Sequence, residues 1–531
     1  MKAKEINSEI SVSYSKLRMI ALVYISLPLF CFFLGWLKWY WAGLSCLALL
    51  ICLLTAGKKA VHKTDDLSEK KFGFSVRMLV LIVLISAVFS FLCGIGRFWA
   101  QSNDYPVRNA IFRDLILYDW PIYYDKYSGA LSYYIAIWLP TALPGKIVYL
   151  LGGDSQAAFL VGNLSLYVYF VTGLTIMFLL IARFLNDNNL KHICILVIGF
   201  IFFSGMDAIA PQFEDRFLHL EWWSGLFQYS SMTTCVCWVF NQVLIPWICM
   251  ALLLNEKTVS NYILIGMCCL LSGPFPFFGY FIYCLANGVK RLTDLTKAKM
   301  GIVFLKEVFS ISNICSTLFV FPFIGSYLMS NSAYDKFDSS GPIFEAPYWV
   351  PFQFVLYFLF LMIEFGFFSI LIFGDNKRNY LFYITVIQLV AYPLFHLGDN
   401  SDFTMRASIP GLFMMYVLCY QYLLKRVTIF DNQKETRKNN AKRKKEFKKQ
   451  HIILLTLVIC LIIGAITPSV ELLRGCVQVY NRGIDDHITD GVVTLNQETN
   501  PVNNSQWPPS AYVALNLDEK LFFKYFARKQ E

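Results

Sequence analysis

Charged side chains gather in the segment 101–120, QSNDYPVRNAIFRDLILYDW, directly after a long apolar stretch. Its carboxylates and guanidiniums are interspersed with tyrosines and a tryptophan. At a membrane–water boundary, partial desolvation raises the pKa of a carboxylate toward the range of a general base, and a neighbouring guanidinium keeps it ionised. The pattern makes Asp104 and Asp114 candidate catalytic residues, with Arg108 and Arg113 as candidate substrate-binding cations.

Structural roles compete with these assignments. Asn103 or Asp104, placed ahead of Tyr105 and a proline, has the residue type and position of a helix N-cap. Asp114 and Asp119 could form surface ion pairs with nearby arginines, and such pairs contribute little to stability. The sequence leaves both roles open.

A second polar cluster lies in the segment 203–231, which combines acidic residues with a tryptophan pair. Aromatic faces can stack on the C–H face of a sugar ring, and planar polar side chains can pair with its hydroxyls. Tryptophan pairs at a membrane surface are also common interfacial anchors, and that alternative stays open. The candidate substrate-binding residues of this segment are Arg216, His219, Glu221, Trp222 and Gln228.

The third candidate segment is 395–412, FHLGDNSDFTMRASIPGL. Arg406 lies at the start of an apolar run, where a charge is costly unless it is paired or contacts an anionic ligand. Arginine suits phosphate because its planar guanidinium gives two parallel hydrogen bonds. Asp402 and Arg406 are therefore candidate substrate-binding residues, and a simple i,i+4 ion pair between them is the alternative.

The composition shows which environment must hold these residues. Of 531 residues, 56% are hydrophobic and 15% are charged, and the mean hydropathy is +0.51. A soluble domain has an apolar share of about 45–50% and a charged share of about 25%. Apolar runs long enough to cross a hydrocarbon core of about 30 Å recur along the chain. We expect an all-α membrane protein with many spans.

Thirteen apolar runs are candidate transmembrane helices. The first follows a basic N-terminus but has no clear small-residue cleavage site, so we expect an uncleaved span rather than a signal peptide. The cysteines lie almost entirely within apolar runs, where cysteine is a packing residue, so no metal site is expected. The runs are 17–36, 39–56, 77–98, 157–182, 191–206, 236–254, 259–273, 275–290, 308–329, 350–373, 380–397, 405–424 and 451–468.

The distribution of charge predicts the orientation. With a cytoplasmic N-terminus, and with the apolar stretch 129–151 kept out of the bilayer core, the inner loops hold 26 basic and 11 acidic residues. The outer segments then hold 6 basic and 14 acidic residues, a separation that follows the positive-inside rule. Pro140 and Pro144 also favour a helix at the interface over a span. The segment 99–156 thus reads as one large exterior loop.

A basic block at 425–450 supplies +8 of the formal net charge of +10. Beside a span, such a block is typical of a cytoplasmic loop or of contact with anionic lipid, so we do not expect nucleic acid as a partner. The chain then divides into an N-terminal hairpin and loop, 1–76, a transmembrane module, 77–468, and an exterior tail, 469–531. The tail ends in LDEKLFFKYFARK, either a short amphipathic helix on the membrane or over the site, or the helical end of a disordered tail.

These features together resemble the GT-C superfamily of polyprenyl-phosphate-sugar glycosyltransferases. In that family an early span leads into a long exterior loop with an acidic catalytic residue, and juxtamembrane helices follow. Here Asp104 follows a span, and GALSYYIAIWLPTALPGKIVYLLGGDSQAA, 129–158, is similar to the juxtamembrane segment. The resemblance covers about 77–425, and the chain differs from the common arrangement by two further spans before the loop.

The resemblance implies an inverting enzyme of the bacterial plasma membrane, with its C-terminus exterior. It would transfer a sugar from a polyprenyl-phosphate donor to a glycan or lipid acceptor of the cell envelope. Asp104 would deprotonate the acceptor hydroxyl, and Arg108 and Arg406, with His219 or Arg216, would bind the departing phosphate. No cofactor is implied, and the sequence has no nucleotide-binding or metal-binding motif.

Two other functions stay open. A transporter or flippase for lipid-linked glycans would use Glu364, Asn241 and Gln242, which lie within apolar runs. Such a transporter should have internal repeats, and the sequence shows none. A polysaccharide polymerase or ligase would also act on the outer face, with a lipid-diphosphate oligosaccharide as donor.

Overall fold

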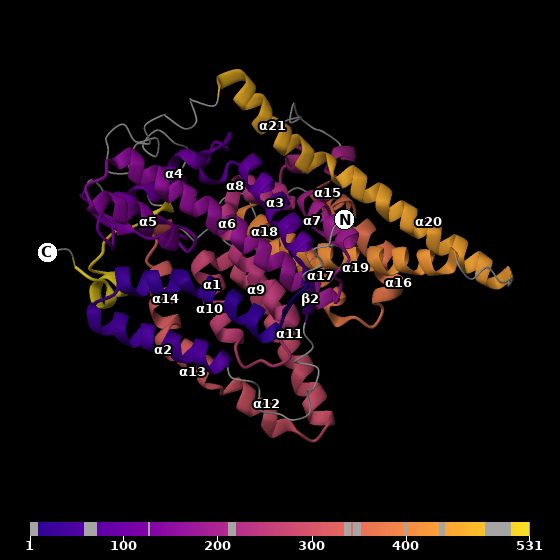
Figure 1. Ribbon diagram of the computed structural model, residues 1–531, viewed down its shortest axis with the longest axis horizontal. Helices are drawn as coiled ribbons and strands as arrows, with labels where there is room; N and C mark the ends of the chain where they lie inside the picture. The colour runs from indigo at the N-terminus through magenta and orange to yellow at the C-terminus, as the bar shows by residue number, and fades with distance from the viewer. Residues whose placement is uncertain are drawn as a thin grey trace, which may run out of the picture. The chain divides into compact units, whose positions relative to one another are not determined.

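The computed structural model describes nine stretches of the chain, and within them the protein is mainly helical (Figure 1). Short strands form three small antiparallel sheets, which the apolar periodicity did not predict. The described stretches are 9–57, 72–125, 128–210, 219–333, 341–343, 352–397, 401–434, 441–483 and 511–529.

The chain divides into two compact units, each built from segments that are distant in sequence. The first unit comprises Met1–Asn188, Cys237–Asp338 and Gly475–Glu531, and the second comprises Asn189–Val236 and Ser339–Arg474. Two helices run across a unit boundary, α8 (Met232–Val239) and α21 (Ile466–Arg482).

In the first unit, the helices α1 and α2 form an N-terminal hairpin that packs on later helices, α2 on α13 and α1 on α10. The helices of this unit are α1 (Tyr14–Trp36), α2 (Trp39–Gly57), α3 (Val76–Leu92), η2 (Ile95–Arg97), α4 (Tyr105–Leu117), α5 (Trp138–Leu150), α6 (Ser155–Leu185), η6 (Phe240–Gln242), α9 (Leu244–Asn255), α10 (Tyr262–Ser272), α11 (Pro274–Lys297), α12 (Gly301–Val308), α13 (Ile311–Phe319), α14 (Phe321–Leu328) and η13 (Phe522–Phe526). Its strands are β1 (Glu9–Val12), β2 (Phe72–Ser75), β3 (Tyr123–Tyr124), β4 (Gly129–Leu131) and β7 (Val513–Ala514).

In the second unit, α19 packs on α7, α16 and α17, and α16 also contacts α20. The helices are α7 (Leu190–Ile201), η4 (Asp207–Ile209), η5 (Leu220–Trp222), α15 (Phe352–Leu361), the π-helical turn η9 (Met362–Gly366), α16 (Phe367–Asn376), α17 (Tyr380–Ala391), η10 (Tyr392–Leu394), α18 (Asp402–Ala407), α19 (Ile409–Lys434) and α20 (Ala441–Gly464). The strands β5 (Gly341–Pro342) and β6 (Phe395–His396) pair with each other.

Six helices of the described residues are long and apolar enough to cross a membrane, and a bent pair brings the number to seven. This confirms a mainly helical chain with helices capable of spanning a membrane; the expected total of thirteen stays a prediction. Four further apolar helices are shorter: Val76–Leu92, Leu190–Ile201, Tyr262–Ser272 and Tyr380–Leu394. The six long helices are Tyr14–Trp36, Trp39–Gly57, Ser155–Leu185, Gly301–Leu328, Phe352–Asn376 and Lys448–Asn481.

The apolar stretch 129–151 forms a strand and a short helix instead of a span. Helix α5 has 13 residues, so it is about 20 Å long and shorter than a hydrocarbon core of about 30 Å. It packs on α4 and α6 and exposes Ile147, Leu150 and Leu151. Such a helix suits a membrane surface better than a crossing.

The end of the chain packs on the first unit. Strand β7 adds to the β3–β4 hairpin, and Leu37 forms a bridge with Ala527. Phe522 is fully buried, with its ring 5.9 Å from Phe32 and 5.3 Å from Tyr327. Within LDEKLFFKYFARK, the structure has one π-helical turn at Phe522–Phe526, which aromatic packing holds on the first unit. Whether this segment lies on the membrane or over the site stays a prediction.

Candidate functional site

Helix α4 holds the first candidate pair. Asp104 occupies the N-cap position, yet its side chain makes no capping hydrogen bond. It accepts a hydrogen bond from Arg108 Nη2 at 3.0 Å, one helical turn later. The side chain of Asp104 remains 32% exposed and that of Arg108 only 5%. The carboxylate is thus anchored by a buried guanidinium and keeps an accessible face.

Arg108 lies among aromatic rings. Its guanidinium carbon is 5.9 Å from the centre of the Tyr105 ring, and the phenols of Tyr133 and Tyr512 are close enough to interact with its charge. Nη1 of Arg108 is buried and has no hydrogen-bond partner among the described residues. A buried, charged N–H group without an acceptor is energetically costly. Nη1 is therefore suited to donate a hydrogen bond to an oxygen of a ligand or of water. The approach of Tyr512, from the far end of the chain, has no local signal in the sequence.

The other two candidates on α4 point elsewhere. Arg113 donates to Ser155 Oγ at 3.1 Å and lies over the ring of Phe159, at the start of α6. Asp114 is fully buried and accepts a hydrogen bond from the Tyr124 hydroxyl. Ten residues of helix separate Asp114 from Asp104, a rise of about 15 Å. The structure therefore brings Asp104 and Arg108 together, but not Arg113 or Asp114 with them.

In the second unit, the segments 203–231 and 395–412 meet. Gln228 accepts a hydrogen bond from Ser401 at 3.0 Å, and its amide nitrogen donates to Ser230. Arg406 pairs with Asp402 one turn away in α18, which is the ion pair given as the alternative to phosphate binding. A phosphate contact by Arg406 stays a prediction.

His219 and Trp222 form a stacked pair in this unit. Their ring centres are 4.3 Å apart, and Trp222 is 42% exposed, as an interfacial anchor or a sugar platform would be. Burial and the positive charge of Arg474 lower the pKa of His219 to about 4. At neutral pH His219 is therefore uncharged, which limits it to neutral hydrogen bonds with a ligand.

Three buried carboxylates gather near η4 and η5. Glu364, in the π-helical turn η9, accepts a hydrogen bond from Trp223 Nε1 at 3.1 Å and lies near the carboxylate of Asp207. Glu221 accepts from the Ser231 amide at 2.8 Å. Its burial, followed by the charge of Asp207, raises the pKa of Glu221 to about 8.

This cluster went largely unpredicted. The sequence singled out Glu364 as an acidic residue within an apolar run, but it offered no partner, because Trp223 lies 141 residues away along the chain. Nothing in the sequence distinguishes Asp207 from the other acidic residues of the segment 203–231. Gly205 packs so closely on Glu364 that a side chain at this position would clash with it.

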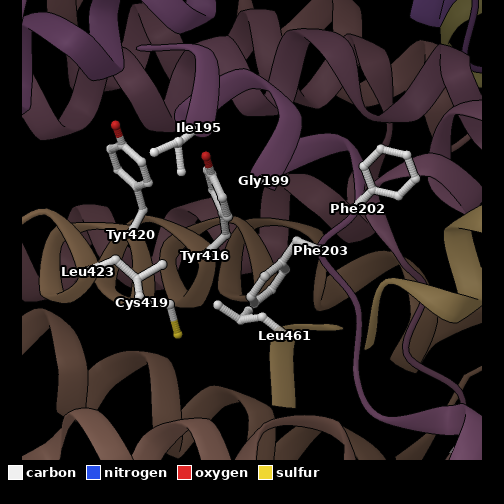
Figure 2. Close-up of a pocket in the computed structure, with 9 residues that line it drawn as sticks. All are labelled: Ile195, Gly199, Phe202, Phe203, Tyr416, Cys419, Tyr420, Leu423 and Leu461. Carbon is white, nitrogen blue, oxygen red and sulfur yellow. The ribbon is translucent and has the colours of Figure 1, made fainter. Parts of the chain in front are cut away.

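An apolar pocket lies between α7, α19 and α20 of the same unit (Figure 2). The hydroxyls of Tyr416 and Tyr420 donate to the carbonyls of Leu196 and His192, so these rings turn apolar faces to the pocket. It suits a hydrocarbon chain and offers no group for catalysis. Its lining is Ile195, Gly199, Phe202, Phe203, Tyr416, Cys419, Tyr420, Leu423 and Leu461.

One sequence candidate, Arg216, lies outside the described residues. Within the described stretches, no group of three or more histidine, cysteine, aspartate or glutamate side chains is arranged to hold a metal ion. Comparisons with protein-family models, curated proteins and solved structures found no match to this chain. Its function must therefore be argued from its own side chains.

Proposed function

We propose that the protein is an inverting glycosyltransferase with thirteen membrane spans and a cytoplasmic N-terminus. It transfers a sugar from a polyprenyl-phosphate donor to a glycan or lipid acceptor on the outer face of a bacterial plasma membrane. One observation carries the proposal: the partly exposed Asp104 carboxylate is fixed by a buried arginine that keeps a second, unsatisfied donor. The resemblance of the loop 99–156 to the GT-C arrangement supports it.

In the proposed reaction, Asp104 accepts the proton of the acceptor hydroxyl. The hydroxyl oxygen forms a bond to the anomeric carbon while the bond from that carbon to the phosphate oxygen breaks, with inversion. The bonding electrons leave with the lipid phosphate, and Arg108 Nη1 donates a hydrogen bond to it. The hydrogen bond from Arg108 Nη2 also fixes the position of the Asp104 carboxylate.

The remaining candidates take secondary roles in this proposal. Asp114 and Arg113 position α4 through Tyr124 and Ser155. In the second unit, Trp222 offers a stacking surface, and the other candidates of the segments 203–231 and 395–412 contribute hydrogen bonds or charge to substrate binding. These candidates are Arg216, His219, Glu221, Gln228, Asp402 and Arg406.

The test is the variant Asp104→Asn, assayed for transfer of radiolabelled sugar from polyprenyl-phosphate donors in nanodiscs. Loss of a general base lowers the rate by about 10²–10⁴-fold. Asparagine does not neutralise the buried Arg108 guanidinium, so the unfolding temperature should also fall, and transfer is therefore compared per folded molecule. Asn103→Ala, an exposed neighbour, serves as the control. Full activity in Asp104→Asn would refute the assignment.

A transporter or flippase for lipid-linked glycans is the second candidate. The buried carboxylates of Asp207 and Glu364 support it, since buried ionisable groups in membrane helices often mark ion or proton pathways. Movement of fluorescent polyprenyl-phosphate sugar across liposomes, abolished in Glu364→Gln, would favour this function over transfer. A polymerase or ligase would instead require a lipid-diphosphate donor in the transfer assay.

A further inference from the structure

A broken helix in the first unit presents two buried amides. The chain leaves α8 at Val239, makes the 3₁₀ turn η6, and continues as α9 after a bend of 103°. Asn241 and Gln242 lie in that turn and are 1% and 0% exposed. Breaks of this kind in apolar helices place polar groups where a continuous helix would present only apolar side chains.

The hydrogen-bonding capacity of these amides is unmet. Among the described residues, Gln242 has no partner for either its nitrogen or its oxygen, and the side-chain oxygen of Asn241 has none. The Asn241 nitrogen donates only to the Tyr134 carbonyl, at 3.3 Å. Buried amides are normally paired, and leaving one unpaired is unfavourable, so these atoms point to a missing polar partner.

The turn belongs to the same aromatic cluster as Arg108. The ring of Phe240 stacks on Tyr105 at 5.4 Å, and Tyr105 lies beside the Arg108 guanidinium. The carbonyl bound by Asn241 belongs to Tyr134, whose ring stacks on Tyr133 at 4.8 Å. The amides of η6 and the unsatisfied arginine donor are therefore linked through one cluster of aromatic rings.

The other side of the turn faces the junction between α10 and α11. Ser272 donates to the backbone carbonyl of Asn241 at 2.8 Å, which fixes the turn. Gly273 packs on Gln242, and a Cβ placed there would lie 3.1 Å from the amide oxygen. The absence of a side chain at Gly273 leaves Gln242 room for its present position.

We infer that Asn241 and Gln242 bind the hydroxyl groups of the sugar carried by the lipid phosphate. Neutral amides offer both donors and acceptors, which match hydroxyl groups, and the surrounding rings supply stacking surfaces for the sugar. Arg108 provides the positive charge for the phosphate. The inference rests on the proposed function for the identity of the ligand, but it concerns binding and can be tested without turnover.

The experiment measures how probes stabilise the protein in nanodiscs against heat. The probes are polyprenyl phosphate alone and polyprenyl phosphates carrying glucose, mannose, galactose, N-acetylglucosamine or arabinose. We expect the wild type to bind at least one sugar-bearing probe more tightly than the bare phosphate, from the concentration dependence of the unfolding temperature. Gln242→Leu should lower the affinity for that sugar-bearing probe about tenfold or more. Its affinity for bare polyprenyl phosphate should stay within about twofold of the wild-type value.

Ligand-free Gln242→Leu should unfold at a higher temperature than the ligand-free wild type. This result would show that the variant folds and that the buried Gln242 amide lowers the stability of the wild type. Asn163→Leu is the matched control, because this buried amide already donates to Phe159 O. It should leave the preference for the sugar-bearing probe unchanged.

Three results would overturn the inference. They are equal binding of all probes by the wild type, an unchanged sugar preference in Gln242→Leu, and loss of that preference in Asn163→Leu to the same degree. Sugar-dependent binding without any transfer by the wild type would instead refute the glycosyltransferase and leave the sugar site standing.

Discussion

The hydroxyl of Tyr124 lies 3.0 Å from the carboxylate of Asp114 and donates a hydrogen bond to it. Burial, together with the charge of Asp114, raises the pKa of Tyr124, so the phenol stays protonated and the bond persists at neutral pH. The pair joins α4 to β3, the first strand of the sheet that also receives β7. Asp114 thus has a structural partner, while Asp104 retains an exposed face.

Tyr124→Phe should destabilise the protein without impairing its chemistry. Removing the hydroxyl leaves a buried carboxylate short of a donor, which costs about 1–3 kcal/mol. Thermal unfolding in detergent measures the loss, and transfer per folded molecule should be unchanged. Tyr123→Phe is the control, because its hydroxyl donates to an exposed Arg528 carbonyl that water can satisfy. A large drop in turnover with normal stability would restore Asp114 as a catalytic candidate.

Phe522 should be essential for docking the C-terminal segment. It is fully buried between Phe32 and Tyr327, and truncating a buried phenylalanine to alanine costs about 3–5 kcal/mol. Phe522→Ala should therefore lower the unfolding temperature and expose the segment to protease. It should also reduce transfer, because Tyr512 lies beside Arg108 on the same segment. Tyr525→Ala, at a 52% exposed position, should do neither.

How far the sequence could predict this protein depends on the range of each interaction. The helical, membrane-spanning character follows from local runs of apolar residues, and the prolines of 129–151 correctly disfavour a span there. The pair of Asp104 and Arg108 is within one helical turn and could be anticipated. The contacts of Trp223 with Glu364, and of the C-terminal strand with β4, join segments far apart along the chain. No local pattern predicts such pairings.

The sequence also cannot decide between two roles that the same residue types suit equally well. The residue types around Asp402 and Arg406 suit both an ion pair and a phosphate site, and the structure shows the ion pair. Asp104 had the residue type of a cap, yet its carboxylate turned to Arg108, because a buried guanidinium needs a counter-charge more than a helix end needs one acceptor.

Glu221 should make stability depend on pH. Its pKa is raised from an ordinary value of 4.5 to about 8, so between these values the folded state holds a proton that the unfolded state releases. The stabilisation is complete below pH 4.5 and is lost as pH rises through 8, by up to about 1.4 kcal/mol per pH unit.

Glu221→Gln is neutral at every pH and should remove this slope. Thermal unfolding of the variant and the wild type in detergent, at constant ionic strength, provides the comparison. The wild type should lose stability relative to the variant between about pH 5 and 8 and then level off. Asp294→Asn, at a fully exposed carboxylate, should leave the slope in place. Parallel curves for Glu221→Gln and the wild type would contradict the buried, protonated state of Glu221.

The proposed orientation requires Asp104 and Asp402 to face the same compartment. In a cysteine-free background, single cysteines at Asn103 and Ser401 report on these two positions, and one at Lys448 reports on the basic loop. A membrane-impermeant maleimide should label Asn103→Cys and Ser401→Cys in intact cells, because both segments carry the acidic bias of exterior loops. Lys448→Cys should react only after permeabilisation. Labelling of Asn103→Cys and Ser401→Cys from opposite sides would place the two candidate clusters in different compartments, and one active centre could not contain both.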